Sequence, residues 1–306
     1  MNRLCKILLL AVAPVLMCTG CNYNRVIEET SLGEYFRAPK ASSSAFADKV
    51  YEYTPAPGQF IGDPTIFKSL VLTPEAACAW AQERIIAKKF VSLGTFGGYI
   101  VVGFDHSIVN LGSYDFAVYG NAFSGNSEPG VIWVAQDENG NGIPDDTWYE
   151  LRGSEYYNEF TKRNYSVTYF KPGAAAQPVA WRDSEGQEGT IDYLAEFHPQ
   201  DSYYPMWVLQ NEYTLSGTCL KAFNYDKSGN GSQWINPDYS WGYADNFGGN
   251  NFRISDAVDS KGEAVNLKYI DFIKVQTALN AKSGWLGEIS TEVLGFEDLS
   301  MNVSPR

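Results

Sequence analysis

The stretch YIDFIKVQT, residues 269–277, alternates apolar and polar residues over most of its length. This is the pattern of a β-strand that buries one face. YSVTYF, residues 165–170, shows the same alternation. Further short runs rich in Val, Ile, Tyr and Phe, separated by Asn, Gly, Asp and Pro, are YIVVGF 99–104, YDFAVYG 114–120, GVIWVA 130–135, MWVL 206–209 and EYTLSG 212–217. Such runs without alternating helices predict an antiparallel sheet protein, either a β-sandwich or a jelly roll.

One helix is expected before these strands. Thr73 is a suitable N-cap, Pro74 fits the first turn, and Glu75 suits the helix dipole. The helical pattern continues over residues 76–89. One face carries Ala77, Trp80, Ala81, Arg84 and Ile85, so we expect this helix to pack on the sheet. The predicted fold is therefore mainly β, jelly-roll-like, with one N-terminal helix.

The N-terminus has the pattern of a secretory signal. Arg3 and Lys6 precede an apolar run over residues 7–17, which is too short to span a bilayer. Thr19-Gly20-Cys21 resembles a bacterial lipobox, so residues 1–20 are predicted to be removed and Cys21 to be lipidated. The alternative is an ordinary signal peptide that is cut near Gly20.

Charge and cysteine content narrow the possible partners. Removing residues 1–20 takes away two basic residues and changes the net charge from −13 to −15. An acidic chain without a basic cluster argues against nucleic acid and is compatible with divalent cations. Cys78 and Cys219 would remain besides Cys21, either as two free thiols, which we favour, or as one disulfide.

Three segments are expected after cleavage. Residues 21–45 read as the lipidated cysteine and a polar tether. Residues 46–300 form a single β-sandwich domain. Within it, residues 222–251 make a long, irregular and aromatic loop, and a loop of that length in a compact domain is usually functional or disordered.

The segment DENGNGIPDDTW, residues 137–148, predicts a calcium loop. Oxygen-bearing side chains at alternate positions, followed by Gly142, resemble the front half of an EF-hand loop and the short calcium loops of dockerin-like repeats. Trp148 stands where an EF-hand has its bidentate Glu. The alternative is a polar hairpin without an ion. The expected calcium ligands are Asp137, Asn139, Asn141, the Ile143 carbonyl, and Asp145 or Asp146.

Catalytic motifs are sparse, which favours a protein that is not an enzyme. No H-E-x-x-H or G-x-S-x-G motif is present, and His106 and His198 are the only histidines. Carboxylate pairs for glycosidic cleavage depend on spatial rather than sequence distance, so no spacing selects among Glu128, Glu150 and Glu155. A second ion site is a weaker possibility at GYADN 242–246 and DAVD 256–259.

Aromatic residues gather in the segments predicted as loops. Rings on loops stack on sugars or macrocycles at small entropic cost, although large aromatics also fill cores. The expected ligand-binding residues are Tyr203, Tyr204, Trp207, Trp234, Tyr239 and Trp241.

Several stretches resemble a family of Bacteroidetes cell-surface lipoproteins: ADKVYEYTPAPGQFIGD 47–63, FVSLGTFGGYIVVGFDHSIVN 90–110, DFAVYGNAF 115–123, SEPGVIWVAQDENGNGIPDDTWYELRGSEY 127–156 and GWLGEISTEVLGFEDL 284–299. Some members of that family are encoded beside systems for vitamin B12 uptake. The resemblance implies an outer-membrane lipoprotein at the cell surface that captures a nutrient.

The leading expectation is thus a binding protein that takes up a corrinoid and passes it to a TonB-dependent outer-membrane transporter. A glycan is the alternative ligand. Two further classes of protein stay open at this point: a glycoside hydrolase or lyase, and a structural adhesin.

Overall fold

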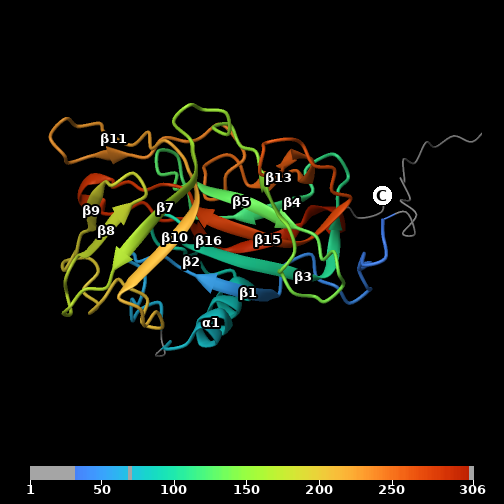
Figure 1. The fold of residues 1–306 in the computed structure, drawn as a ribbon, viewed down its shortest axis with the longest axis horizontal. Helices are drawn as coiled ribbons and strands as arrows, with labels where there is room; N and C mark the ends of the chain where they lie inside the picture. Colours follow the sequence, from blue (N-terminus) through green and yellow to red (C-terminus); the bar gives the residue numbers. More distant parts are fainter. Residues whose placement is uncertain (1–31, 68–70, 303–306) are drawn as a thin grey trace, which may run out of the picture.

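A computed structural model describes residues 32–67 and 71–302 of the chain (Figure 1). It is mainly β, with several antiparallel sheets and one α-helix. The largest sheet has six strands in the order β1-β3-β15-β5-β6-β14. These strands span Lys49–Thr54 (β1), Tyr99–Val109 (β3), Tyr269–Thr277 (β15), Gly130–Ala135 (β5), Trp148–Leu151 (β6) and Ala257–Val258 (β14).

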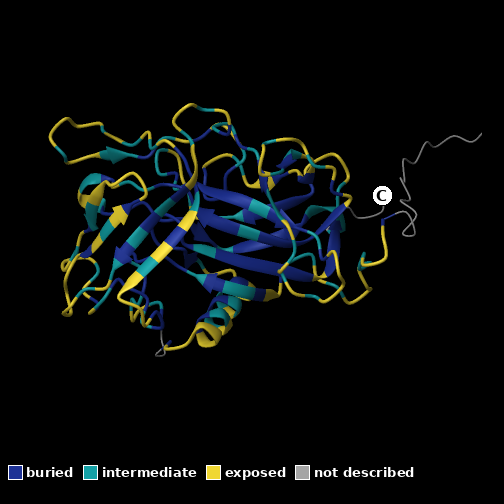
Figure 2. Cartoon of the chain, in the orientation of Figure 1, coloured by how far each residue is buried: buried dark blue, intermediate teal, exposed yellow. Residues whose placement is uncertain are grey.

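Strand β15, which is the alternating stretch YIDFIKVQT, lies in the middle of this sheet. It pairs antiparallel with β3 on one side and β5 on the other. The alternation predicted one buried face, but every residue of β15 except Lys274 is buried (Figure 2). The polar residues on its second face are satisfied inside the protein: Asp271 accepts hydrogen bonds from Ser107 Oγ at 2.6 Å and from Arg37 Nη2 at 3.0 Å.

A four-stranded sheet, β10-β7-β8-β9, forms the left-hand part of the molecule in Figure 1. Its strands are Glu212–Cys219 (β10), Lys162–Phe170 (β7), Val179–Asp183 (β8) and Glu188–Ile191 (β9). Gln276 of β15 links the two sheets, because its Nε2 donates to Ser216 O of β10 at 2.8 Å and to Gly97 O at 3.0 Å. Tyr169 of β7 adds a second link by donating to Phe96 O at 2.7 Å.

Helix α1, Pro74–Ile86, packs on β1. Thr73 caps it as predicted, since Thr73 Oγ1 accepts a hydrogen bond from Ala76 N at 3.1 Å. The helix buries Ala77, Ala81 and Ile85. It ends earlier than the expected residue 89, and Lys88 has a left-handed φ of 52° that closes the helical run.

Smaller sheets and short helices complete the fold. A three-stranded sheet orders β13-β4-β17, and two-stranded pairs join β16 to β2 and β11 to β12. Their bounds are Val91–Ser92 (β2), Phe116–Tyr119 (β4), Tyr225–Asp226 (β11), Trp234–Ile235 (β12), Asn251–Phe252 (β13), Glu292–Val293 (β16) and Gly295–Asp298 (β17). Within the described residues, 3-10 helices span Ile254–Asp256 (η2), Gly284–Leu286 (η3) and Leu299–Asn302 (η4).

Two expectations about the chain need correction. The run 206–209 is not a strand: Trp207 lies in a turn, and burial of Trp207 and Val208 explains their apolar character. The described part of the expected tether, residues 32–45, packs on the domain. Arg37 forms an ion pair with Asp271 at 3.0 Å, and Ala45 O accepts a hydrogen bond from Asp298 N at 2.7 Å.

The structure tests the expectation for the cysteines but not the one for the signal peptide. The signal peptide 1–20 and Cys21 lie outside the described residues. Cys78, in α1, and Cys219, in β10, are both free thiols, as we favoured. Across residues 32–67 and 71–302 there is no helix with the length and apolar character needed to cross a membrane.

Candidate functional site

The predicted calcium loop, residues 137–146, connects β5 to β6 as expected for a hairpin. Asp137 organises it: its carboxylate accepts hydrogen bonds from Asn141 N at 3.1 Å and Gly142 N at 2.9 Å. Asn141 Oδ1 accepts from Ile143 N at 2.7 Å, and the Ile143 carbonyl accepts from Asp145 N at 2.9 Å. Several of the expected ligand oxygens therefore accept hydrogen bonds from amides of the loop itself.

The remaining expected ligands of this loop are also drawn into internal hydrogen bonds. Asn139 Nδ2 donates to Asp146 Oδ1 at 3.3 Å, and Asn141 Nδ2 lies 3.1 Å from both oxygens of Asp145. These contacts fit a polar hairpin and do not test binding of an ion. Calcium at Asp137, Asn139, Asn141, Ile143, Asp145 and Asp146 remains a prediction.

Most of the expected aromatic binding surface belongs to the core instead. Tyr203, Tyr204, Trp207 and Tyr239 are buried. The hydroxyls of the three tyrosines form hydrogen bonds within the fold: Tyr203 donates to His198 O at 2.8 Å, for example. Buried rings have no face for a ligand, so these four residues are removed from the expected surface. Trp234 is partly buried and packs against Gly284.

Trp241 is the one residue of the expected set that is exposed, at 47%. Its neighbours hold it outward. Tyr239 is fixed in the core by two hydrogen bonds with the Asn246 side chain, at 2.7 and 2.8 Å. Tyr243 is buried on the other side, and its hydroxyl accepts from Glu155 N at 2.9 Å. Gly242 is required between them, because a Cβ there would lie 2.5 Å from Gly153 Cα.

A cleft of about 590 Å³ opens beside Trp241. Tyr114, 52% exposed, presents a second ring, and the Arg253 guanidinium lies 4.6 Å from that ring. Arg152 and Asp256 line the same cleft, with 3.9 Å between Nη2 and Oδ1. We call this the Trp241 cleft.

The charged groups of the Trp241 cleft are only partly satisfied. Arg152 Nε is buried and donates to no described residue. Burial raises the pKa of Asp256, while the Arg152 and Arg253 charges oppose that rise. A cleft that combines two aromatic rings with the guanidinium groups of Arg152 and Arg253 can bind a flat ligand that carries hydrogen-bond acceptors.

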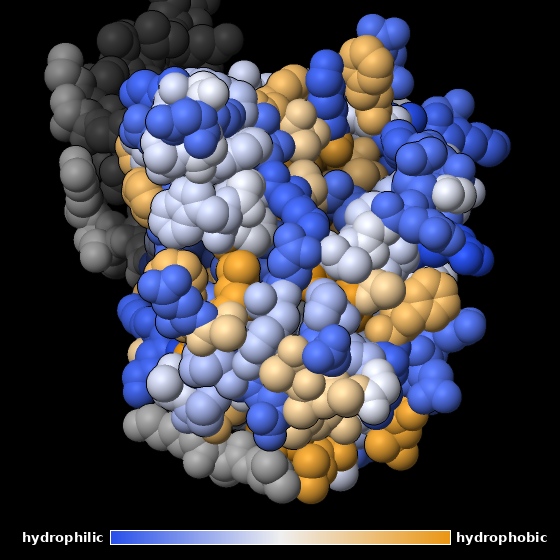
Figure 3. Space-filling view, turned by 90° about the vertical axis from the view of Figure 1, so that its left-hand side faces the viewer, coloured by the Kyte–Doolittle hydropathy of each residue, from blue (hydrophilic) through white to orange (hydrophobic). Residues whose placement is uncertain are grey.

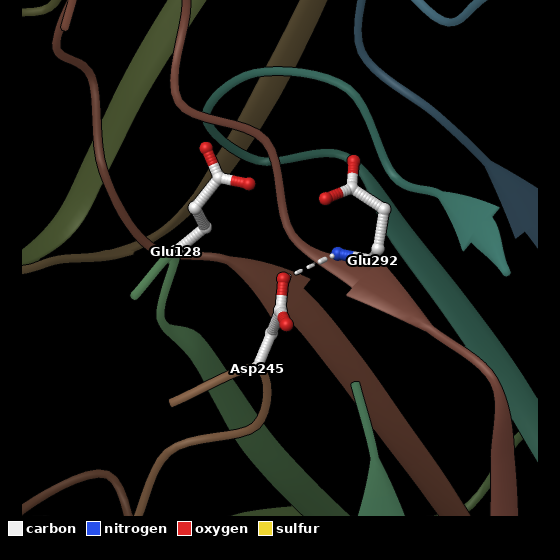
Figure 4. A group of neighbouring side chains, drawn as sticks. All are labelled: Glu128, Asp245 and Glu292. Atoms are coloured by element: carbon white, nitrogen blue, oxygen red, sulfur yellow. Dashed lines mark hydrogen bonds between the residues drawn. The ribbon is translucent and has the colours of Figure 1, made fainter. Parts of the chain in front are cut away.

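A second site lies where three distant segments meet. Carboxylate oxygens of Glu128, Asp245 and Glu292 all lie within 4.8 Å of one another (Figure 4). Glu128 precedes β5, Asp245 follows the buried Tyr243, and Glu292 begins β16. It is the only such cluster of His, Cys, Asp or Glu found among the described residues.

The Asp245 side chain is hydrogen-bonded to the backbone around it. Its Oδ1 accepts hydrogen bonds from Asn121 N and Ala122 N, both at 2.9 Å, and its Oδ2 accepts from Glu292 N at 2.9 Å. It adopts a left-handed φ of 50°, which Asp tolerates better than most residues. The Asp245 carboxylate thus links its own segment to residues 121–122 and to the start of β16.

The three carboxylates share a poorly hydrated environment. Burial raises the pKa of Glu128 well above its usual value, and the charges of Glu292 and Asp245 raise it further. Burial and the Glu292 charge likewise raise the pKa of Asp245. Burial also raises the pKa of Glu292, although hydrogen bonds from Ser290 and other neighbours oppose this. The cluster therefore favours binding of positive charge, as protons or as a metal ion.

A cavity of about 290 Å³ adjoins this cluster, and Glu128 and Glu292 line it. Its rim includes Phe197 and Trp285, with ring centroids 6.0 Å apart. Gln59 and Glu288 also line it and are 8% and 5% exposed. We call this cavity with its carboxylate cluster the acidic pocket. The segment that follows β9 contributes Leu194, Phe197 and His198 to its lining. Figure 3 shows the end of the molecule formed by β8, β9 and β11, where hydrophilic residues surround smaller hydrophobic patches.

The sequence identified only part of the acidic pocket. Glu128 is a carboxylate candidate in the sequence, and the stretch containing Asp245 is expected to form an ion site with DAVD 256–259. The two acids of DAVD lie elsewhere. Asp256 lines the Trp241 cleft, and Asp259 accepts hydrogen bonds from Lys261 N and Glu263 N in its own turn. Glu292 was missed, because nothing in its local sequence distinguishes it from a strand residue.

The side chains of the remaining catalytic candidates form hydrogen bonds within the fold. Glu150 accepts a hydrogen bond from Thr218 Oγ1 at 2.6 Å, and burial raises its pKa to about 7. Glu155 bonds to Asn158 Nδ2 at 2.7 Å. His106 is buried between Asp105 and Asp298, at 2.8 and 3.1 Å.

Comparisons with known proteins add no family to this geometry. The chain matches no protein-family model, and a search of curated proteins finds no significant match. Function therefore has to be argued from the two sites themselves.

Proposed function

We propose that this protein is a non-enzymatic, lipid-anchored binding protein of the bacterial outer membrane that captures a small nutrient in the Trp241 cleft. The observation that carries the proposal is the pair of exposed rings, Tyr114 and Trp241, which share the cleft with Arg152 and Arg253. Rings held outward by a buried framework stack on a ligand at little entropic cost. The lipid anchor rests on the lipobox at Cys21 and on the family resemblance.

The fold that best accommodates this cleft is a jelly-roll-like β-sandwich over residues 46–300. Two antiparallel sheets joined by the buried side chains of Gln276 and Tyr169 support that architecture. The Trp241 cleft would then be made by loops at the margin of the sandwich, as ligand sites on antiparallel sheet proteins often are.

The chemistry of the cleft favours an acidic glycan. Sugar rings stack on Tyr114 and Trp241, and a sugar carboxylate would accept hydrogen bonds from Arg152. A volume of about 590 Å³ is in the range of small-ligand pockets. A corrinoid, which the resemblance favours, would stack on the same rings but extend beyond a cleft of this size. It is the second candidate, and transfer to a TonB-dependent transporter is proposed for either ligand.

Calorimetric titration tests the proposal. The mature chain without its lipid, residues 22–306, is titrated separately with uronate-containing oligosaccharides and with cyanocobalamin. For the ligand that binds, Trp241→Ala should weaken affinity by roughly 10- to 100-fold, the value of one buried ring. Tyr157→Ala, an exposed tyrosine outside the cleft, is the matched control and should leave affinity unchanged.

The result of that titration decides the ligand class and the site. Binding of neither ligand, or equal losses in both variants, would refute the proposal. Release of reducing ends from an oligosaccharide by the wild-type protein would replace it with a hydrolase or lyase.

A further inference from the structure

We propose that the acidic pocket binds a divalent metal cation, Ca²⁺ being the best fit, through Glu128, Asp245 and Glu292. Two oxygens bound to one Ca²⁺ at 2.3–2.6 Å lie at most about 5 Å apart. The three carboxylates meet this limit without rearrangement, since their ligand atoms lie within 4.8 Å of one another. In Figure 4 the carboxyl groups of Glu128 and Glu292 face each other across a gap.

Charge balance supports a cation at this position. The ion pairs formed by the described residues leave Glu128, Asp245 and Glu292 without a lysine or arginine partner. Asp245 and Glu292 are buried and Glu128 is half-buried, and ionised carboxylates in such surroundings are strongly unfavourable without a counter-charge. A divalent ion would neutralise two of the three negative charges while binding all three groups.

An independent observation comes from two other residues that line the cavity, Gln59 and Glu288. Gln59 Oε1 and Glu288 Oε2 are buried and accept no hydrogen bond from any described residue. The second Glu288 oxygen is held by Gln59 N, which fixes the position of that side chain. Free acceptors of this kind suit the water molecules that complete the coordination of a metal ion, because such waters are hydrogen-bond donors.

The ligand types select a hard cation. The cluster offers only carboxylate oxygens, and Asn121 and Asn126 add amide groups to the cavity wall. His198 is the one imidazole that lines the cavity, but it is not part of the carboxylate cluster. Its Nδ1 lies 3.9 Å from Asp63 Oδ2. An all-oxygen set with an open side favours Ca²⁺ or Mg²⁺ over Zn²⁺. Ca²⁺ fits better because it accepts irregular geometry.

The test must separate this site from the predicted loop at residues 137–146. We would titrate the EDTA-treated mature chain with CaCl₂ by calorimetry, using wild type, Glu292→Gln and Asp137→Ala. The proposal expects Glu292→Gln to lose one Ca²⁺ equivalent or weaken it by more than about 100-fold. Asp137→Ala should keep that equivalent. MgCl₂ in place of CaCl₂ measures the preference between the two ions.

Terbium provides a second readout at the pocket itself, because Trp285 on its rim can sensitise bound Tb³⁺. On an Asp137→Ala background, which removes any contribution from the predicted loop, Glu128→Gln should abolish the sensitised emission, and Glu159→Gln, an exposed control, should not. Melting in EDTA checks folding: both pocket variants should be at least as stable as wild type there, because each removes a repelling charge. Wild-type Ca²⁺ affinity and stoichiometry in both pocket variants would overturn the proposal, as would absence of Ca²⁺ binding to wild type.

Discussion

Glu150 offers the sharpest test of the electrostatics of the sheet. Burial raises its pKa to about 7 from a usual 4.5, so the folded protein binds a proton there that the unfolded chain releases at lower pH. The stability from this proton is complete below pH 4.5 and is lost as pH rises through 7. At about 1.4 kcal/mol per unit, the free energy of unfolding should fall by about 3 kcal/mol over this window.

Glu150→Gln removes this dependence while keeping an acceptor for Thr218 Oγ1, which donates to Glu150 at 2.6 Å. Urea unfolding of both proteins between pH 4 and pH 8 measures the effect. The variant should gain about 3 kcal/mol relative to wild type between the two ends of the range. Glu159→Gln, on the surface, should gain nothing. A constant difference between Glu150→Gln and wild type across the range would refute the reasoning.

Three further predictions address the fold and the loop. Gly98→Ala should cost at least about 3 kcal/mol in urea unfolding, because its Cβ would lie 1.8 Å from Leu93 O; Gly173→Ala, with no heavy atom within 4 Å of its Cβ position, is the control. Thr73→Ala should cost about 1 kcal/mol by loss of the α1 cap, and an unchanged unfolding midpoint would contradict this. If the loop at 137–146 binds Ca²⁺, Asp137→Ala should abolish its share of the calcium-dependent rise in melting temperature, measured on a Glu292→Gln background.

Much of the fold was predictable because strand periodicity is a local property. Six of the seven predicted strands and the capped helix are present. The failure at 206–209 has a clear cause: a short apolar run shows that residues are buried but not what backbone they adopt. The burial of both faces of β15 was likewise invisible, since it depends on neighbours such as Arg37, far away in sequence.

The candidate sites were much less predictable, because both depend on tertiary structure. Tyr239 and Trp241 are two positions apart in one loop, yet only the tryptophan is exposed. No sequence rule separates them, because the Tyr239 backbone is held by tertiary contacts: Tyr239 N donates to Asn246 Oδ1, and Asn246 Nδ2 donates to Tyr239 O. The acidic pocket assembles from Glu128, Asp245 and Glu292, whose separation along the chain exceeds any recognisable motif spacing.

The docking of residues 32–45 limits how far the domain can reach. If Cys21 carries the lipid, only eleven residue steps separate it from Leu32, where the described structure begins. Even fully extended, that distance is about 40 Å. The described chain starts at the right-hand end of Figure 1, while β9 and the acidic pocket lie towards the other end. In that case the first end could lie no farther than about 40 Å from the bilayer, and the acidic pocket would lie on the side of the domain away from the anchor.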